Sequence, residues 1–205
     1  MPTLITDPHV EAELLEQRRA WEGDRFDEVW DGVYVMAPLA NLEHHELMAK
    51  LSAAFCNAFA SQPEVRVFAG VNVSDREEDW EKNYRCPDVA VVLPGSRAVD
   101  CGAFYCGGPD FCVEIISDYD RSREKFDFYA AVGVRELLLI DRNPWQLELY
   151  RLAGERFKPA GVMDPESQQA LASQVLPLTF KLLARPSQRP QIEVANPSTN
   201  ERWLA

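Results

Sequence analysis

The sequence predicts a single α/β domain in which a mixed sheet is flanked by helices. Three features lead to this prediction: two nearly continuous apolar runs typical of central strands, an amphipathic helix on either side of them, and an N-terminal hairpin. We expect the domain to span residues 1–184. Residues 185–205 contain three prolines and little periodicity, so we expect a tail that is loosely ordered or packs on a partner.

The first half of the chain indicates a helix, a hairpin, a second helix and a strand. Charges separate the apolar positions of residues 9–21, which is typical of an amphipathic helix. Asp31-Gly32 lies between two β-prone segments and suits the positive φ angles of a two-residue hairpin turn. Apolar residues recur every three or four positions over residues 42–60, which predicts a long helix. Residues 64–74 alternate as a half-buried strand does.

The second half supplies the centre of the predicted sheet. Residues 87–93 and 110–116 are apolar runs that each have one acid in their interior, and the second run also begins with Asp110. The glycine-rich segment between them is expected to be a surface excursion. A helix is predicted over residues 121–132, and strands over residues 136–141 and 146–152.

Composition and charge restrict the class of protein. A hydrophobic content of 46% and a charged content of 26% are those of a globular chain. No apolar stretch is long enough for a membrane span or a secretory signal, so we expect a cytoplasmic protein whose five cysteines are reduced. The net charge of −12 disfavours strong non-specific binding to nucleic acid, although a local basic strip and bound divalent cations can offset it. Motifs of nucleotide kinases, serine hydrolases, zinc proteases and dinucleotide enzymes are absent from the sequence.

Two acids lie within the apolar runs: Asp88 near the start of the first, and Glu114 inside the second. An ionised carboxylate costs several kcal/mol to bury unless it is paired or binds a metal, so each acid requires a partner. A shared magnesium ion would serve both, because it takes one or two carboxylates together with water and substrate phosphate. Neighbouring strands lie about 4.8 Å apart, which is close enough for two acids at matched heights to bind one ion.

Lys125 lies on the helix predicted after the second run. Its ammonium group could hold an attacking water or stabilise charge on phosphate oxygens. Tyr129 follows four residues later on the same helical face and could brace the site. We therefore take Asp88, Glu114 and Lys125 as the candidate catalytic group of a phosphodiesterase.

Each candidate also has a purely structural interpretation. Asp88 could cap a turn, Glu114 could form a buried salt bridge, and Lys125 could be a solvated surface charge. Weaker signals give four candidates for substrate contact or for support of the catalytic group: Glu28, His44, Ser117 and Tyr129.

The order of these residues resembles that of a known family. The segments concerned are Pro87-Asp88, VEIIS at residues 113–117, Lys125 with Tyr129, and GVRELLLID at residues 133–141, preceded by Glu28, the VMAP turn at residues 35–38, and His44. From about Phe26 to Leu183 the chain resembles the Uma-type restriction endonucleases, a bacterial branch of the PD-(D/E)XK nuclease superfamily.

The resemblance implies a restriction-endonuclease-like three-layer core and hydrolysis of a phosphodiester, with DNA as the expected substrate. It implies a magnesium ion, replaceable by manganese, bound by Asp88, Glu114 and the backbone carbonyl of Ile115. The superfamily usually places the lysine two residues after the second acid, where this chain has Ile116, so Lys125 would supply it from the helix instead. A homodimer is expected by analogy with enzymes that cut both strands.

Two other functions stay open. The acidic charge and the missing Glu-x-Lys pattern allow a catalytically inactive protein of this fold that dimerises or binds a partner. A glycosidase that uses Asp88 and Glu114 as an acid and base pair would need no metal.

Overall fold

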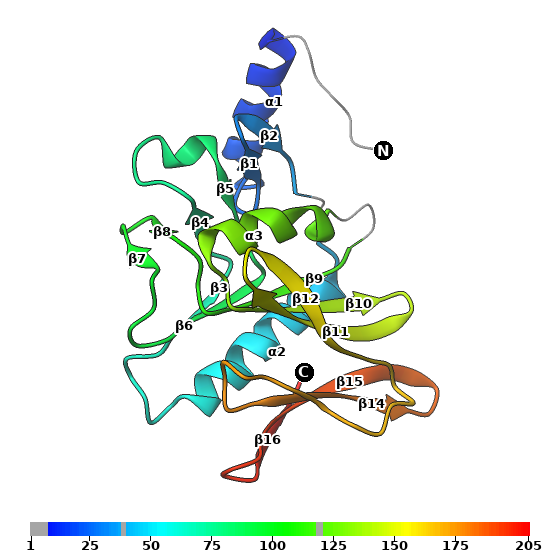
Figure 1. Cartoon of the computed structure of the whole chain (residues 1–205). Coiled ribbons are helices and arrows are strands. Elements are labelled where there is room, and N and C mark those ends of the chain that lie inside the picture. Colours follow the sequence, from blue (N-terminus) through cyan, green and yellow to red (C-terminus); the bar gives the residue numbers. More distant parts are fainter. Residues whose placement is uncertain (1–7, 38–39, 118–120) are drawn as a thin grey trace.

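The computed structural model describes residues 8–37, 40–117 and 121–205. Its centre is a six-stranded sheet in the order β12-β11-β10-β9-β6-β3 (Figure 1). The strands are β3 (Arg66–Ala69), β6 (Val89–Val92), β9 (Phe111–Ile115), β10 (Glu136–Arg142), β11 (Trp145–Ala153) and β12 (Arg156–Met163). β9 and β10 run parallel and the other neighbours antiparallel, so the sheet is mixed, as predicted.

Helices cover both faces of this sheet. α2 (Leu42–Ala58) packs on one face, and α3 (Phe126–Val132), which continues the 3-10 turn η2 (Ser122–Lys125), packs on the other. Alternation along β9 explains the two contacts, because Val113 joins the cluster that contains α2, whereas Cys112 joins Tyr129 of α3 in a second cluster. The predicted layers are confirmed, as are the helices predicted over residues 42–60 and 121–132, the second of which begins with a 3-10 turn.

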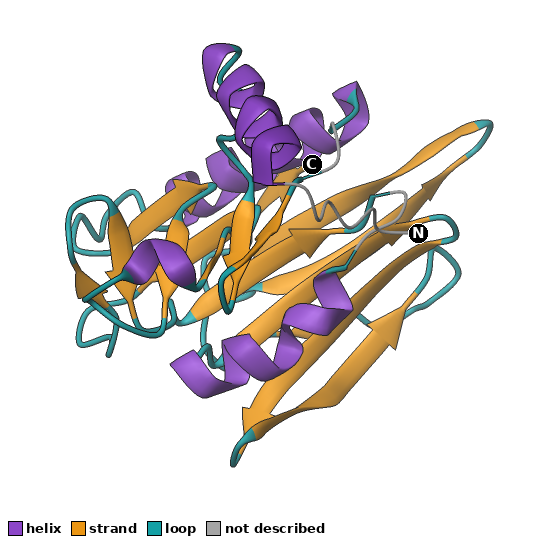
Figure 2. Cartoon of the chain, turned by 90° about the horizontal axis from the view of Figure 1, so that it is seen from above, coloured by secondary structure: helices purple, strands orange, loops and turns teal. Residues whose placement is uncertain are grey.

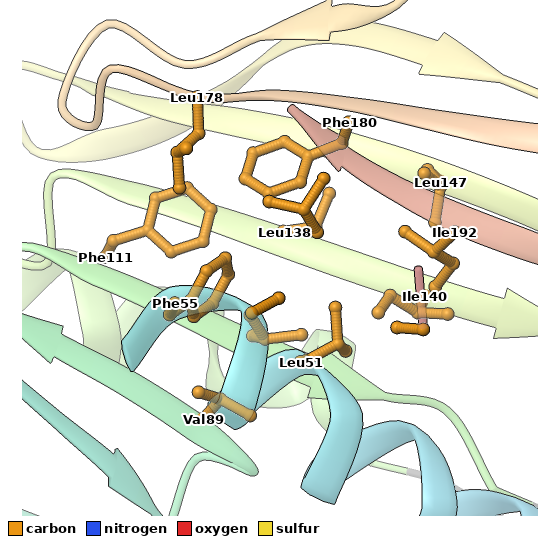
Figure 3. Close-up of a cluster of buried hydrophobic side chains, with 14 of the residues drawn as sticks. Leu51, Phe55, Val89, Phe111, Leu138, Ile140, Leu147, Leu178, Phe180 and Ile192 are labelled. Atoms are coloured by element: carbon orange, nitrogen blue, oxygen red, sulfur yellow. The ribbon is translucent and has the colours of Figure 1, made fainter. Parts of the chain in front are cut away.

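A second sheet, formed by the C-terminal strands, packs against both α2 and the central sheet. Its order is β13-β14-β15-β16, with β13 (Leu171–Ala172), β14 (Thr179–Arg185), β15 (Gln188–Asn196) and β16 (Glu201–Leu204). Figure 3 shows Leu51 and Phe55 of α2 in one cluster with side chains of the central sheet and with Phe180 of β14. Phe55 makes edge contacts with Phe180 and with Phe111.

The expectation of a loosely ordered tail over residues 185–205 is wrong. β15 pairs with β14 along most of its length, and Ile192 and Val194 are fully buried. These two residues alternate with polar neighbours, which is a strand pattern that the prolines obscured. Pro186 and Pro197 lie in the turns on either side of β15 and so do not interrupt it.

A third sheet holds the N-terminal hairpin. Its order is β2-β1-β5-β4-β8-β7, with β1 (Glu28–Trp30), β2 (Val33–Val35), β4 (Asn72–Ser74), β5 (Tyr84–Arg85), β7 (Val99–Asp100) and β8 (Phe104–Cys106). The predicted hairpin turn is confirmed, with φ of 49° at Asp31 and 84° at Gly32. α1 (Pro8–Ala20) and this hairpin lie at the end of the molecule opposite the C-terminal sheet (Figure 1). In Figure 2 strands make up most of the ribbon and helices are few.

Two local predictions need correction. The alternation over residues 64–74 belongs to two strands in different sheets, because the chain turns at Gly70, where φ is 68° and the Phe26 ring fills the space of a side chain. The glycine-rich excursion contains β7 and β8, and Phe104 is buried there against Trp80. The end of the VMAP turn, at Pro38, lies outside the described residues. None of the helices in the described ranges is long and apolar enough to cross a bilayer.

Candidate active site

The predicted site residues meet at one cleft of about 720 Å³. It lies where the hairpin, the start of α2 and the C-terminal end of β9 come together. The predicted residues that line it are Glu28, His44, Asp88, Glu114, Ile115, Ser117 and Lys125. Tyr129, the remaining candidate, is fully buried on α3 and donates a hydrogen bond to Glu114.

Asp88 joins the central sheet to α2. The ladder between β6 and β9 ends where Val89 faces Val113. Beyond that point Asp88 Oδ2 accepts a hydrogen bond of 2.7 Å from the backbone N–H of Ile115, and Asp88 Oδ1 lies 2.9 Å from Nε2 of His44. Its carboxylate therefore extends the sheet by one bond and points at the cleft, rather than capping a turn.

Glu114 is held by polar groups of η2 and α3. Strand alternation turns its side chain towards α3, and 4% of that side chain is exposed. Lys125 Nζ lies 3.1 and 3.0 Å from its two oxygens, and Ser122 donates a hydrogen bond of 3.2 Å to Oε2. These bonds and that from Tyr129 supply the partners that a buried carboxylate requires.

Glu28 reaches the same lysine from the hairpin. Its Oε1 lies 2.8 Å from Lys125 Nζ and accepts a hydrogen bond of 2.8 Å from the backbone N–H of Cys86. Its Oε2 accepts one of 2.6 Å from the indole N–H of Trp30. Glu28 is thus an internal acid of the cleft, and Lys125 lies between two carboxylates.

A second polar network surrounds His44 at the start of α2. His44 Nδ1 lies 3.0 Å from Ser117 Oγ, and the backbone N–H of His44 donates to the cap of α2, the side chain of Asn41. Arg142 donates hydrogen bonds of 2.9 Å to that Asn41 side chain and 3.0 Å to the carbonyl of Ile116. One arginine of β10 therefore ties the end of β9 to the start of α2.

Sequence reasoning did not find Arg142, Ser122 or Trp30 as site residues. Arg142 follows a strand and precedes a turn, a context that surface arginines share. Ser122 lies three residues before Lys125, and only the placement of η2 beside β9 reveals its contact. Trp30 is two residues after Glu28 and so lies on the same face of β1. This two-residue repeat of a strand was the one sequence feature that could have placed Trp30 beside Glu28.

The cluster contains more negative charge than its lysine can neutralise. Glu28, Asp88 and Glu114 bring three carboxylates, whereas Lys125 brings one ammonium group. Burial raises the pKa of Glu114 to about 8; the nearby Lys125 opposes that rise, and the charges of Asp88 and Glu28 add to it. Burial acts to lower the pKa of Lys125, but the surrounding acids outweigh it and raise that pKa. The folded site therefore tends to retain a proton on an acid.

The donor set suits magnesium better than zinc. Asp88 and Glu114 offer carboxylate oxygens, and the carbonyl of Ile115 points to the same side of β9 as its N–H, which binds Asp88. Within the described part of the chain, no three His, Cys, Asp or Glu side chains are grouped as ligands of one ion. Zinc sites usually have three or four such ligands, but magnesium needs one or two carboxylates and completes its shell with water and phosphate.

Comparison with known proteins places the chain in a family. The family model Uma2, described as "Putative restriction endonuclease", matches residues 13–185. The chain belongs to the Uma2 family. A solved structure described as a "putative nuclease belonging to DUF820 from Anabaena variabilis ATCC 29413" matches with a TM-score of 0.56 and 16% identity, over 73% of this chain and 83% of that chain. A search of curated proteins gives no match.

The predicted resemblance is therefore confirmed, and the fold of this Uma2 protein is restriction-endonuclease-like. The family description indicates a nuclease, and the structural neighbour supports the fold. In this Uma2 chain Ile116 occupies the position two residues after Glu114, and the lysine that contacts Glu114 comes from η2.

Proposed function

We propose that the protein is a metal-dependent endonuclease that hydrolyses DNA phosphodiester bonds. Asp88, Glu114 and the carbonyl of Ile115 would hold Mg²⁺, for which Mn²⁺ could substitute. One observation carries the proposal: within the cleft, the carboxylates of Glu28, Asp88 and Glu114 gather at a single lysine, and a divalent cation would offset the negative charge that this lysine does not neutralise.

The protein's own residues would then divide the chemistry. The bound ion would supply Lewis acidity and a more acidic water. Lys125 keeps its proton and presents an ammonium group, which can donate to a phosphate oxygen as charge develops there. Tyr129 and Ser122 orient the carboxylate of Glu114 by donating to opposite oxygens. His44 fixes the carboxylate of Asp88 in the same way.

Binding of nucleic acid by an acidic chain requires local positive charge. Arg18, Arg25 and Arg121 line the cleft, although Arg18 pairs with Asp27 and Arg121 with Glu124. Together with a bound cation they supply the local basic strip that the net charge of −12 otherwise lacks.

The second candidate is an inactive protein of the same fold. Its support is that Lys125 already pairs with Glu114, which satisfies both groups without metal. This alternative predicts that stability and structure do not respond to magnesium.

A homodimer, expected from the sequence, stays a prediction that light scattering would test.

The experiment is to compare Asp88→Asn, Glu114→Gln and Lys125→Met with the unmodified protein in DNA cleavage and in calorimetric titration with Mg²⁺ and Mn²⁺. Cleavage should fall by roughly 10²- to 10³-fold in each variant, and the two acid variants should also lose metal binding. Glu148→Gln is the matched control, because Glu148 is a buried acid that pairs with Arg123 outside the cleft. Folded variants that cleave as well as the unmodified protein would refute the proposal.

A further inference from the structure

The cleft extends beyond the acid cluster into an aromatic half formed by the turn after α1 and by the hairpin. Residues lining this half include Trp21, Phe26, Trp30 and Met36. Trp21 leaves 79% of its surface exposed. A tryptophan normally contributes a large buried area, so an indole exposed at the rim of a cleft is available to a ligand.

Guanidinium groups accompany these rings. Arg121 and Arg85 lie over Trp30 at 4.1 and 4.5 Å from the ring centroid, and Arg25 lies over Phe26 at 5.5 Å. These two rings already carry guanidinium groups, so the exposed Trp21 is the ring that a ligand would stack on. A guanidinium group is planar and stacks on aromatic faces, so this half of the cleft combines flat apolar surfaces with positive charge. The ligand that matches both properties is an aromatic group attached to an anion.

We propose that the aromatic half of the cleft receives an unpaired nucleobase, so that the substrate is single-stranded DNA or a strand displaced from a duplex. This inference rests on the proposed nuclease function and specifies its substrate class. A cleft of about 720 Å³ has the size of a small-molecule site, which accepts a nucleotide and does not enclose a duplex. An unpaired base beside Trp21 would lie in the same cleft as Lys125, whose ammonium group can bind a phosphate.

The charge of the protein favours the same substrate. Duplex binding depends on neutralising many phosphates, which a chain of net charge −12 does poorly. A base stacked on an aromatic side chain contributes about 1–3 kcal/mol whatever its sequence. In a duplex the bases are already stacked on each other and cannot reach Trp21 unless the strand opens.

The test measures binding separately from cleavage, with Ca²⁺ in place of Mg²⁺. Fluorescence anisotropy of a labelled thymidine oligomer should show roughly tenfold weaker binding by Trp21→Ala, equivalent to about 1.4 kcal/mol. Trp21→Phe should keep most of the affinity because it keeps a ring. Leu204→Ala, which removes an exposed apolar side chain of β16 outside the cleft, should bind as the unmodified protein does. Affinity for a duplex should not change in any of these variants.

Equal affinity of Trp21→Ala and the unmodified protein for the oligomer would overturn the inference, as would an equal loss for oligomer and duplex. A Trp21→Ala variant that changes the protein's oligomeric state but binds the thymidine oligonucleotide as the unmodified protein does would also overturn it, since the surface would then serve self-association. Magnesium-dependent cleavage that survives in Trp21→Ala without loss would leave the nuclease proposal intact and remove the base site. Binding of the oligonucleotide that depends on Trp21, with no cleavage in any metal, would support the base site and contradict the nuclease proposal.

Discussion

Lys125→Met should destabilise the metal-free protein far more than the loss of an ordinary lysine. Lys125 Nζ lies 2.8 Å from Glu28 and 3.0 Å from Glu114, and 11% of the lysine side chain is exposed. Methionine keeps most of the volume but leaves two buried carboxylates without a cation. Removing one partner of a buried ion pair costs about 3–5 kcal/mol. We expect a loss of that size in the free energy of unfolding.

The loss should depend on pH and on magnesium. Acidification protonates the orphaned carboxylates, so the difference between variant and unmodified protein should shrink as the pH falls. Magnesium at a hundred times its dissociation constant would add about 2.7 kcal/mol to either folded state, and the variant should bind it at least as well because no ammonium group competes.

The assay is urea unfolding of both proteins in EDTA and in excess MgCl₂, at several pH values. Lys82→Met is the control, because Lys82 forms an exposed pair with Asp79 that contributes at most about 1 kcal/mol. If Lys125→Met lost no more stability than Lys82→Met, the acids would not depend on this lysine and the reasoning would fail.

Three further predictions concern neighbouring groups. The pKa of Glu114 is about 8 in the folded protein against an ordinary value of 4.5. The free energy of unfolding without metal should therefore fall by up to about 1.4 kcal/mol per pH unit as the pH rises from 4.5 to about 8. Urea titrations at several pH values should show that Glu114→Gln removes this slope. Glu28→Gln should weaken magnesium binding by roughly tenfold, because it removes one charge from the cluster, and unchanged affinity in calorimetry would exclude Glu28 from the electrostatics of the site. Arg142→Ala should lower the cleavage rate by roughly 10- to 100-fold, because it removes the hydrogen bonds that support the site. Arg156→Ala on β12 is the control. Equal cleavage rates in both variants would show that the network around His44 is dispensable.

The sequence predicted the central sheet because its strands have strong local signals. The runs that became β6 and β9 are apolar on both faces. Asp88 lies directly before β6 and Glu114 lies inside β9, where an ionised carboxylate requires a partner. Asp88 and Glu114 were identifiable for that reason. The hairpin was identifiable because Asp31-Gly32 is compatible with few other turns.

The other features of the site and fold depend on contacts between segments that are distant in the sequence. The role of Glu28 as a partner of Lys125 follows from the packing of the hairpin on η2, and no local pattern indicates it. Arg142 joins segments about a hundred residues apart. The C-terminal strands were missed because prolines outweighed a weak alternation, although those prolines lie mainly in turns.

A crystal structure of the protein soaked in Mn²⁺ would test the central claim most directly, because manganese scatters anomalously. The account predicts an anomalous peak at about 2.0–2.2 Å from oxygens of both Asp88 and Glu114, with the Ile115 carbonyl completing the protein ligands. A structure without such a peak, in which Lys125 still bridges Glu28 and Glu114 at saturating manganese, would contradict it.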